Sequence, residues 1–363
     1  MRPWVLSHIE TLQPYVPGKP IAETQREFGL RDVVKLASNE NPLGPSPLAK
    51  AAMAEALGTL HLYPDASSHD LSRKLAVRLG VRPEQIVLGS GSNEVIELLI
   101  RTFMVPERDE ALVVRGSFVM YKVSLQAHGR NFVEVPMKAG FQYDLDALAA
   151  RLGPKTRMVF LANPDNPTGT AFPKSAFSAF MAKVPKACLV VLDEAYFEYA
   201  QGGELPDGIA ELSRYPNLAV LRTFSKAYGL AGLRVGYGVM QAELAGYLHR
   251  CRMPFNVSTL AQVAALAALD DSAHVEKTRM LTRQGISEVT RALRGFGAQV
   301  PDSFANFVFA DFGQPAQPLF EALLRKGVIT RPVANYGFPN ALRISVGLEA
   351  ENLRLLAALK EVL

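Results

Sequence analysis

Short apolar runs that contain almost no polar residues constrain the fold of this chain more than any other feature. Examples are VFLA at residues 159–162 and VVLD at residues 190–193. Strands without polar alternation are typical of sheets that helices bury on both faces. The segments of this kind that we predict as strands are Gln85–Leu88, Ala111–Val114, Phe132–Val135, Arg157–Leu161, Cys188–Leu192, Leu218–Leu221 and Val235–Met240.

Helical patterns separate these apolar runs. Two clear examples are Asn93–Thr102 and Leu145–Arg151. Regular alternation of strands and helices predicts an α/β fold, and its large domain is expected to contain a mainly parallel, seven-stranded sheet.

The pattern changes after about residue 250. The expected elements there are helices over Ser258–Leu269, Ser272–Phe296 and Pro318–Lys326, and strands within residues 306–311 (NFVFAD) and 342–347 (LRISVG). We therefore expect a large domain over residues 41–250 and a smaller α+β domain formed by the N-terminal arm, residues 1–40, together with residues 251–363. The 363 residues are enough for two domains with their own cores.

The overall composition excludes several classes of protein. Hydrophobic residues make up 48% of the chain and charged residues 20%, which is ordinary for a globular protein and excludes a disordered or fibrous chain. The 39 basic and 35 acidic residues form no dense basic run, so a mixed solvated surface is favoured over a nucleic-acid site. No segment approaches the roughly 20 uninterrupted apolar residues of a membrane span. We therefore expect a soluble, cytoplasmic protein with no membrane or nucleic-acid partner.

The chain contains two cysteines. Cys188 lies in the apolar run CLVVL, so a buried and inert thiol is expected there. A single disulfide with Cys251 stays open as an alternative.

A glycine-rich motif, GSGSNE at residues 89–94, follows the first predicted strand and opens a helix. Ligands of open parallel sheets bind beyond the carboxyl ends of the strands. Small residues at a helix N-terminus allow backbone N–H groups to approach an anion. Glu94 stands where a dinucleotide-binding motif needs its third glycine, so a single phosphate is a better candidate than a dinucleotide. A turn of purely geometric purpose remains the alternative for this motif taken alone.

Two further motifs follow the predicted strands in the middle of the chain. NPDNPTG at residues 163–169 makes a rigid turn that can hold a side-chain amide in a fixed orientation. DEAY at residues 193–196 begins with a carboxylate at the end of a buried strand. This carboxylate could act as a base, bind a metal or pair with a cofactor cation. A metal is disfavoured because no cluster of His and Asp with ligand spacing accompanies it.

The last motif, TFSKAYGLAGLR at residues 223–234, contains the strongest catalytic candidate, Lys226. A lysine whose pKa is lowered by its surroundings can condense with an aldehyde. Thr223, Ser225 and Arg234 have the chemistry of a phosphate clamp, in which arginine supplies a bidentate fork. A solvent-facing lysine is disfavoured by this flanking sequence.

The motifs NPDNPTG, DEAY and TFSKAYGLAGLR, in this order, resemble those of the fold-type I enzymes that depend on pyridoxal 5′-phosphate. Within that group, they resemble the class I and II aminotransferases specifically. The resemblance covers essentially the whole chain. It implies that Lys226 binds the cofactor covalently and moves a proton, and that Asp193 pairs with the pyridine nitrogen. The residues that it assigns to the rest of the cofactor are Asn166 and Tyr196 at the 3′-oxygen, Phe118 on the ring, and Gly91, Ser92, Asn93, Thr223, Ser225 and Arg234 at the phosphate.

The resemblance also implies a homodimer with composite active sites, because Tyr63 in HLYPD is similar to a tyrosine that reaches the cofactor phosphate of the neighbouring subunit. The segments LQPYVPGKP and LASNENPLGPSP resemble the histidinol-phosphate aminotransferase branch of the family. In that branch Arg343, Arg331 and Tyr15 meet the anionic end of the substrate, and two guanidiniums and a phenol suit that purpose. A docking anchor for the arm is the alternative for Tyr15, and a structural ion pair is the alternative for Arg331.

The expected reaction is therefore transfer of an amino group from histidinol phosphate to 2-oxoglutarate, a step of histidine biosynthesis. Within the same cofactor class, an aromatic aminotransferase and a threonine-phosphate decarboxylase are the alternatives. Outside it, a dinucleotide-dependent dehydrogenase lacks its fingerprint at Glu94. A regulator that keeps only the cofactor fold would need an additional helix-turn-helix domain, and the first 40 residues are too rich in proline to form one.

Overall fold

A seven-stranded sheet forms the centre of the larger lobe in the computed structural model, which describes residues 4–15, 17–200 and 204–363. Its strands run in the order β2-β8-β7-β6-β5-β3-β4, and only β8 pairs antiparallel with its neighbours. The predicted α/β fold with a mainly parallel sheet is confirmed. The strand bounds are Ile86–Gly89 (β2), Glu110–Val114 (β3), Asn131–Val135 (β4), Thr156–Ala162 (β5), Leu189–Asp193 (β6), Leu218–Thr223 (β7) and Gly236–Val239 (β8).

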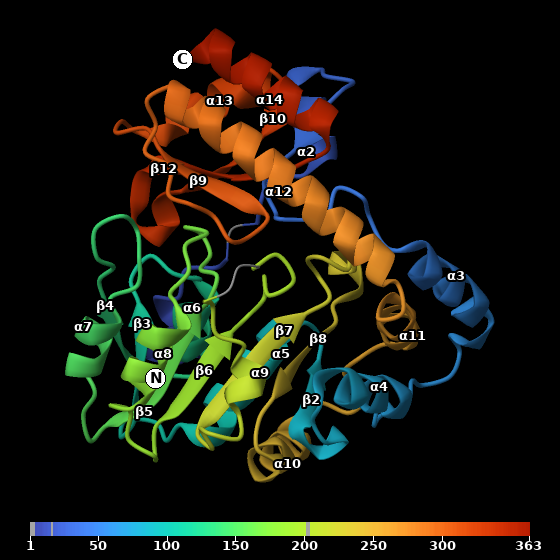
Figure 1. Cartoon of the computed structure of the whole chain (residues 1–363), viewed down its shortest axis with the longest axis vertical. Coiled ribbons are helices and arrows are strands. Elements are labelled where there is room, and N and C mark those ends of the chain that lie inside the picture. Colours follow the sequence, from blue (N-terminus) through green and yellow to red (C-terminus); the bar gives the residue numbers. More distant parts are fainter. Residues whose placement is uncertain (1–3, 16, 201–203) are drawn as a thin grey trace.

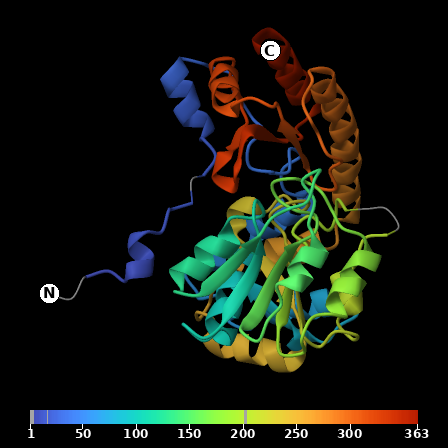
Figure 2. The same cartoon turned by 90° about the vertical axis from the view of Figure 1, so that its left-hand side faces the viewer.

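Helices cover the faces of this sheet (Figures 1 and 2). Helix α5, Ser92–Phe103, packs on β2, β7 and β8 through an apolar face that includes Ile96 and Leu99, while Arg101 in its last turn stays exposed. It also contacts the helices α6 (Met120–Ala127) and α10 (Ala242–Cys251). The other helices of this lobe are α3 (Pro47–Ala56), α4 (His69–Leu79), α6 (Met120–Ala127), α7 (Leu145–Ala150), α8 (Lys174–Met181), α9 (Gly208–Glu211), α10 (Ala242–Cys251) and α11 (Thr259–Ala268).

The smaller lobe lies above the sheet in Figure 1 and is built on a three-stranded antiparallel sheet of order β11-β12-β9. Buried side chains such as Leu293, Val308 and Ile344 form its core. Its elements are α12 (Ser272–Gly295), β9 (Phe307–Asp311), α13 (Ala316–Arg325), β10 (Val328–Ile329), β11 (Arg331–Val333), β12 (Phe338–Ser345) and α14 (Glu349–Val362).

The N-terminal segment reaches both lobes. Helix α1, Ser7–Glu10, contacts α6, and the Gln126 side chain donates a hydrogen bond to the His8 carbonyl. Helix α2, Ile21–Phe28, leads to β1, Val34–Lys35, which pairs in parallel with β10 of the smaller lobe. The arm therefore packs on the larger lobe through α1 and joins the smaller lobe at β1 (Figure 2).

Short 3₁₀ turns complete the described part of the chain: η1 (Leu57–Thr59), η2 (Pro83–Gln85), η3 (Ala231–Leu233) and η4 (Ala334–Tyr336). Over the described residues, no helix is both long and apolar enough to span a bilayer. Cys188 is a buried free thiol whose pKa is raised to about 12 by burial, as its apolar run predicted, and Cys251 is also free.

Candidate active site

A cavity of about 370 Å³ opens where β5, β6 and β7 end beneath the smaller lobe. Ser38 and Asn39 of the segment after β1, together with Arg343 of β12, close it from the other side. Cavities of this size suit a small-molecule ligand. The predicted site residues that line it are Tyr15, Ser92, Asn93, Phe118, Asn166, Asp193, Tyr196, Thr223, Ser225, Lys226, Arg234 and Arg343.

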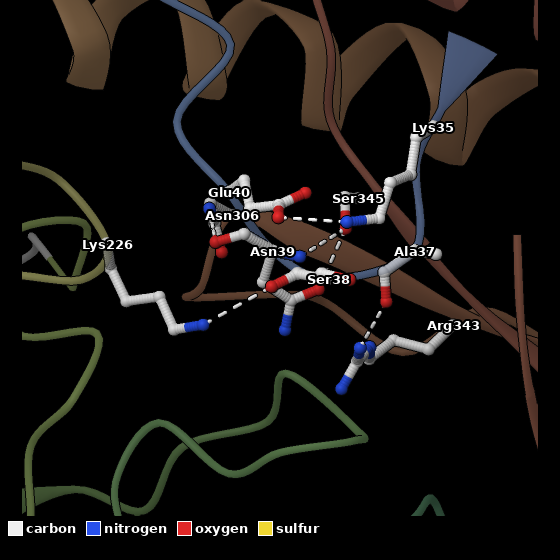
Figure 3. A network of polar contacts seen from close by, with 9 residues as sticks. All are labelled: Lys35, Ala37, Ser38, Asn39, Glu40, Lys226, Asn306, Arg343 and Ser345. Carbon is white, nitrogen blue, oxygen red and sulfur yellow. Dashed lines mark hydrogen bonds and ion pairs between the residues drawn. The ribbon is translucent and has the colours of Figure 1, made fainter. Parts of the chain in front are cut away.

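Lys226 follows β7 in a tight turn. The Thr223 hydroxyl accepts a hydrogen bond from the backbone N–H of Ser225 at 3.1 Å, and Gly229 has a φ of +70°. A Cβ atom on Gly229 would lie 2.2 Å from the carbonyl oxygen of Gly44, so only glycine fits this turn. The turn aims the Lys226 amine into the cavity, where it donates a hydrogen bond to the Ser38 carbonyl at 3.4 Å (Figure 3).

Burial, followed by the nearby positive charge of Arg343, lowers the pKa of the Lys226 amine to about 8. Desolvation disfavours the charged form of an amine, and a neighbouring guanidinium acts in the same direction. About a tenth of this amine is therefore unprotonated at pH 7, and the unprotonated amine is the nucleophilic form.

Asp193 is the last residue of β6 and is 4% exposed. The Tyr121 hydroxyl donates to one carboxylate oxygen at 2.8 Å, and the Ala195 backbone N–H donates to the other at 3.1 Å. Burial raises the pKa of Asp193 to about 6, although both hydrogen bonds and the charge of Lys226 oppose the rise. A carboxylate held in this way favours a cationic partner from inside the cavity.

An anion cradle lies at the N-terminus of α5. Gly91 has a φ of +76°, and a Cβ atom there would lie 2.5 Å from a terminal nitrogen of Arg234. Arg234 also has a positive φ, of +53°, and its other terminal nitrogen donates to the Ser225 hydroxyl at 3.3 Å and to the Ala231 carbonyl at 3.1 Å. Helix N-termini and guanidinium groups both attract anions, so this end of the cavity suits a phosphate.

Asn166 and Arg343 meet at another wall of the cavity. One terminal nitrogen of Arg343 donates to the Asn166 side-chain oxygen at 2.7 Å, and the other donates to the Ala37 carbonyl at 2.6 Å. The guanidinium is buried and lies 5.5 Å from the centroid of the Phe307 ring. Arg343 therefore presents a fixed positive charge to the cavity.

The turn that carries Asn166 is held by its neighbour Asp165, which is fully buried. Asp165 accepts hydrogen bonds from the Ser117 hydroxyl at 2.6 Å and from the Thr168 hydroxyl at 2.8 Å. The Tyr143 hydroxyl is a third donor, at 3.2 Å. This network holds the turn, and the hydrogen bond from Arg343 orients the Asn166 side-chain oxygen.

Three predicted residues do not line the cavity. Gly91 lies directly behind it, against Arg234. Arg331 is buried on β11 opposite Arg343, and its guanidinium lies 5.6 Å from the centroid of the Tyr15 ring, which does line the cavity. Tyr63 is 81% exposed and stacks on Phe255 with 4.6 Å between ring centroids.

Within the described residues, no group of three or more His, Cys, Asp or Glu side chains is arranged to hold a metal ion. The cavity instead combines an amine, a carboxylate and an anion cradle. This is an arrangement for an organic ligand that carries an anion.

A protein-family model described as aminotransferase class I and II matches residues 31–359. The chain belongs to the class I and II aminotransferases. The match excludes a dinucleotide-dependent dehydrogenase, which was an alternative on sequence alone.

Several relatives of this aminotransferase carry a more specific name. The chain is 55% identical over 362 residues to the histidinol-phosphate aminotransferase of Anaeromyxobacter sp., with 99% of each protein covered. It is 49% identical over 357 residues to histidinol-phosphate aminotransferase 2 of Pseudomonas fluorescens, with 98% of this chain and 96% of the relative covered. The crystal structure of histidinol-phosphate aminotransferase from Sinorhizobium meliloti in complex with pyridoxal-5′-phosphate superposes with a TM-score of 0.90 at 31% identity and covers 99% of this chain and 97% of that chain.

Sequence reasoning did not identify three polar residues of this aminotransferase that line the cavity: Ser38, Asn39 and Tyr121. Tyr121 follows the predicted ring residue Phe118 by three positions, and the other two lie in LASNENPLGPSP, so all three lie in or beside segments that the resemblance had marked. Their contacts with Lys226, Tyr196 and Asp193 depend on the folded chain. Spacing along the sequence contains no signal for them.

Proposed function

We propose that this aminotransferase depends on pyridoxal 5′-phosphate and transfers the amino group of histidinol phosphate to 2-oxoglutarate, giving imidazole acetol phosphate and glutamate. The names of relatives that are 49–55% identical over nearly the full chain support this reaction. The observation that carries it is the placement of the Lys226 amine and the Asp193 carboxylate in one cavity with an anion cradle. Because both substrates are charged metabolites, we place the reaction in the cytoplasm.

The residues present fit this cofactor. Its phosphate matches the cradle, which a Cβ atom on Gly91 would fill and where Ser225 and Arg234 offer donors. Its aldehyde matches the Lys226 amine, and its ring nitrogen matches the buried Asp193 carboxylate, which forms no ion pair among the described residues. When bound, the cofactor supplies a carbonyl carbon that carries the amino group and a ring that accepts an electron pair from the substrate.

The chain's own residues have separate roles in the proposed reaction. Lys226, with a pKa lowered to about 8, is suited to take the proton from the substrate Cα and to deliver it to the cofactor's carbonyl carbon. Asp193 keeps the ring nitrogen protonated, because a buried carboxylate strongly favours a neighbouring cation. Asn166 and Tyr196 would hold the phenolic edge of the ring, and Phe118 would contact the ring.

The substrate's anionic end is assigned to Arg343, Arg331 and Tyr15. Arg343 and Tyr15 line the cavity, and the Arg331 guanidinium backs the Tyr15 ring at 5.6 Å. Two guanidiniums on neighbouring strands with a phenol before them suit a phosphate or a carboxylate. Both the phosphate of histidinol phosphate and the carboxylates of 2-oxoglutarate can use this site in turn.

A single-turnover experiment tests the substrate. The holoenzyme is mixed with histidinol phosphate in the absence of a keto acid, and the change in cofactor absorbance is followed. We expect this change to be at least about a hundredfold faster than with phenylalanine, because loss of a phosphate paired with buried guanidiniums costs about 3 kcal/mol or more. A faster reaction with phenylalanine would favour the aromatic aminotransferase, and release of carbon dioxide from threonine phosphate would favour the decarboxylase.

We also propose that the enzyme is a homodimer with composite active sites. Tyr63 and its stacking partner Phe255 lie among exposed apolar side chains that include Leu60, Leu62 and Met253. A cluster of exposed apolar residues of this kind marks an association surface. The interface would bring Tyr63 of the partner subunit to the anion cradle.

Subunit mixing tests the composite site. The variants Lys226→Ala and Tyr63→Ala are each expected to lose most activity, but a hybrid dimer contains one site with neither substitution. Random reassociation of equal amounts should restore about one quarter of the wild-type activity, since half of the dimers are hybrids and each has one intact site of two. Mixing without dissociation is the control. A mixture no more active than the mean of its two components would exclude the shared site.

A further inference from the structure

The segment Ala37–Glu40 crosses the cavity as a strap that side chains from both lobes hold (Figure 3). Its carbonyl oxygens at Ala37, Ser38 and Asn39 accept hydrogen bonds from Arg343, Lys226 and Asn306, at 2.6, 3.4 and 3.0 Å. Each of these donors comes from a different part of the chain. The strap is therefore fixed in place relative to the catalytic amine.

Asn39 is the centre of this strap. It is 1% exposed and has a φ of +56°, a conformation that asparagine and aspartate tolerate better than other residues with side chains. Its backbone N–H donates to the Ser345 hydroxyl at 2.8 Å, and its side-chain nitrogen donates to the Tyr196 hydroxyl at 2.9 Å. Asn39 thus connects the end of β12 with a residue that lines the cavity.

The orientation of the Asn39 amide follows from the single hydrogen on the Ser345 hydroxyl. The Ser345 oxygen already accepts from the Asn39 backbone, and its hydrogen goes to the Asn39 side-chain oxygen at 2.8 Å. Ser345 is 4% exposed, and its hydroxyl has no other acceptor among the described residues. The opposite orientation of the amide would therefore leave a buried hydroxyl hydrogen without an acceptor, which is costly.

This orientation decides what the Tyr196 hydroxyl can do. Its oxygen accepts from the Asn39 amide, and within the described part of the chain it has no second hydrogen-bond partner. The ring is 3% exposed, and its T-shaped contact with Phe307 fixes its position at the cavity wall. The hydroxyl hydrogen consequently has one direction left, which is into the cavity.

We propose that Asn39 is a positioning residue: by donating to the Tyr196 oxygen while Ser345 holds its own amide, it makes Tyr196 a hydrogen-bond donor toward the bound cofactor. The inference rests on the proposed function, because it needs a ligand oxygen in the cavity to accept that hydrogen. It assigns direction to two hydrogen bonds that run from Ser345 through Asn39 to Tyr196, and to a third from Tyr196 to the ligand.

The variant Asn39→Asp tests this direction with almost no change in shape. Aspartate keeps the oxygen that accepts from Ser345 and tolerates the positive φ. Its second oxygen replaces the amide donor, so the Tyr196 hydroxyl must turn its hydrogen away from the cavity and toward residue 39. The substitution therefore reverses one hydrogen bond.

The measurement is a spectrophotometric pH titration of the holoenzyme, which requires no turnover. The visible band reports the proton on the nitrogen of Lys226 in its bond to the cofactor. Without the Tyr196 donor, negative charge on the adjoining ligand oxygen is less stable, so this nitrogen keeps its proton to higher pH. We expect the midpoint in Asn39→Asp to rise by about one pH unit or more.

The same substitution in a Tyr196→Phe background separates the relay from a direct effect of the new charge. Tyr196→Phe has no hydroxyl hydrogen to donate, whether or not residue 39 is also changed. In the Tyr196→Phe background, Asn39→Asp should therefore shift the midpoint by less than about a third of its shift in the wild-type background. Ser345→Ala, which frees the amide to rotate, should give a smaller rise in the wild-type background and provides a test if Asn39→Asp does not fold.

The outcomes are distinct. A rise that requires Tyr196 supports the inference, whereas an unchanged midpoint in both Asn39→Asp and Ser345→Ala would overturn it. An equal rise with and without the Tyr196 hydroxyl would also overturn it, because the charge of aspartate would then act directly. A wild-type protein that shows no visible band reducible by borohydride would reject the proposed function itself, and the inference with it.

Discussion

Lys226→Ala is expected to lower kcat by at least about ten-thousandfold, the upper range for loss of a positioned general acid–base. In the proposed reaction this amine, which lines the cavity, both condenses with an aldehyde and moves a proton, and its pKa, lowered to about 8 by burial, suits both tasks. The measurement is steady-state turnover with histidinol phosphate and 2-oxoglutarate. The variant should still bind the cofactor without a covalent bond, because the cradle and Asp193 are unchanged.

Two controls make this prediction specific. Lys183→Ala removes an exposed lysine that pairs with Asp146 on the surface, and it should retain normal turnover. A small primary amine added to Lys226→Ala should partly restore turnover, because it can occupy the space that the deleted side chain leaves and accept the same proton. Near-normal turnover without any added amine would remove Lys226 from the mechanism.

The strands of the large sheet could be predicted because burial on both faces makes them continuous apolar runs. Residues 190–193, for example, read VVLD and form the buried end of β6. Their order in the sheet could not be predicted, because periodicity reports burial and not partners. The antiparallel placement of β8 between β2 and β7 is decided by the chain connections, which no local pattern encodes.

The short elements are a second class that the sequence does not reveal. β1 and β10 are two residues each, too short for any period, yet their pairing attaches the N-terminal arm to the smaller lobe. The contact of Arg331 with Tyr15 could not be predicted either, because it depends on where the N-terminal arm lies in the folded chain. The predicted domain bounds at residues 41 and 250 stay a prediction, and α11, which lies after residue 250, packs on α3 and α4 of the larger lobe.

The residues of the candidate site likewise include some that the sequence predicts and others that only the folded chain reveals. Lys226 and Asp193 could be predicted because each lies at the carboxyl end of a buried strand, and the ends of adjacent parallel strands meet at one edge. Tyr121 could be located in a motif, but its hydrogen bond to Asp193 spans 72 residues. Asn39 and Ser345 are 306 residues apart, so only the folded chain brings them together.

Asp193→Asn is expected to lower kcat by about a thousandfold, because removing one partner of a buried charge pair costs about 3–5 kcal/mol and each 1.4 kcal/mol is tenfold. The amide keeps the shape of the carboxylate, and Ala195 can still donate to its oxygen. Without the negative charge, the cofactor's ring nitrogen loses its proton more readily and the ring accepts electrons less well. The measurement is steady-state turnover, with the thermal midpoint as a check on folding.

Two comparisons show whether the charge of Asp193 or its shape is responsible. Tyr121→Phe deletes the 2.8 Å hydrogen bond to the carboxylate but keeps the charge, so it should cost only about tenfold. Reconstituting Asp193→Asn with a cofactor methylated at the ring nitrogen supplies a fixed positive charge and should recover part of the lost turnover. If Tyr121→Phe were as damaging as Asp193→Asn, and the methylated cofactor restored nothing, Asp193 would be a structural residue and the ring nitrogen would have another partner.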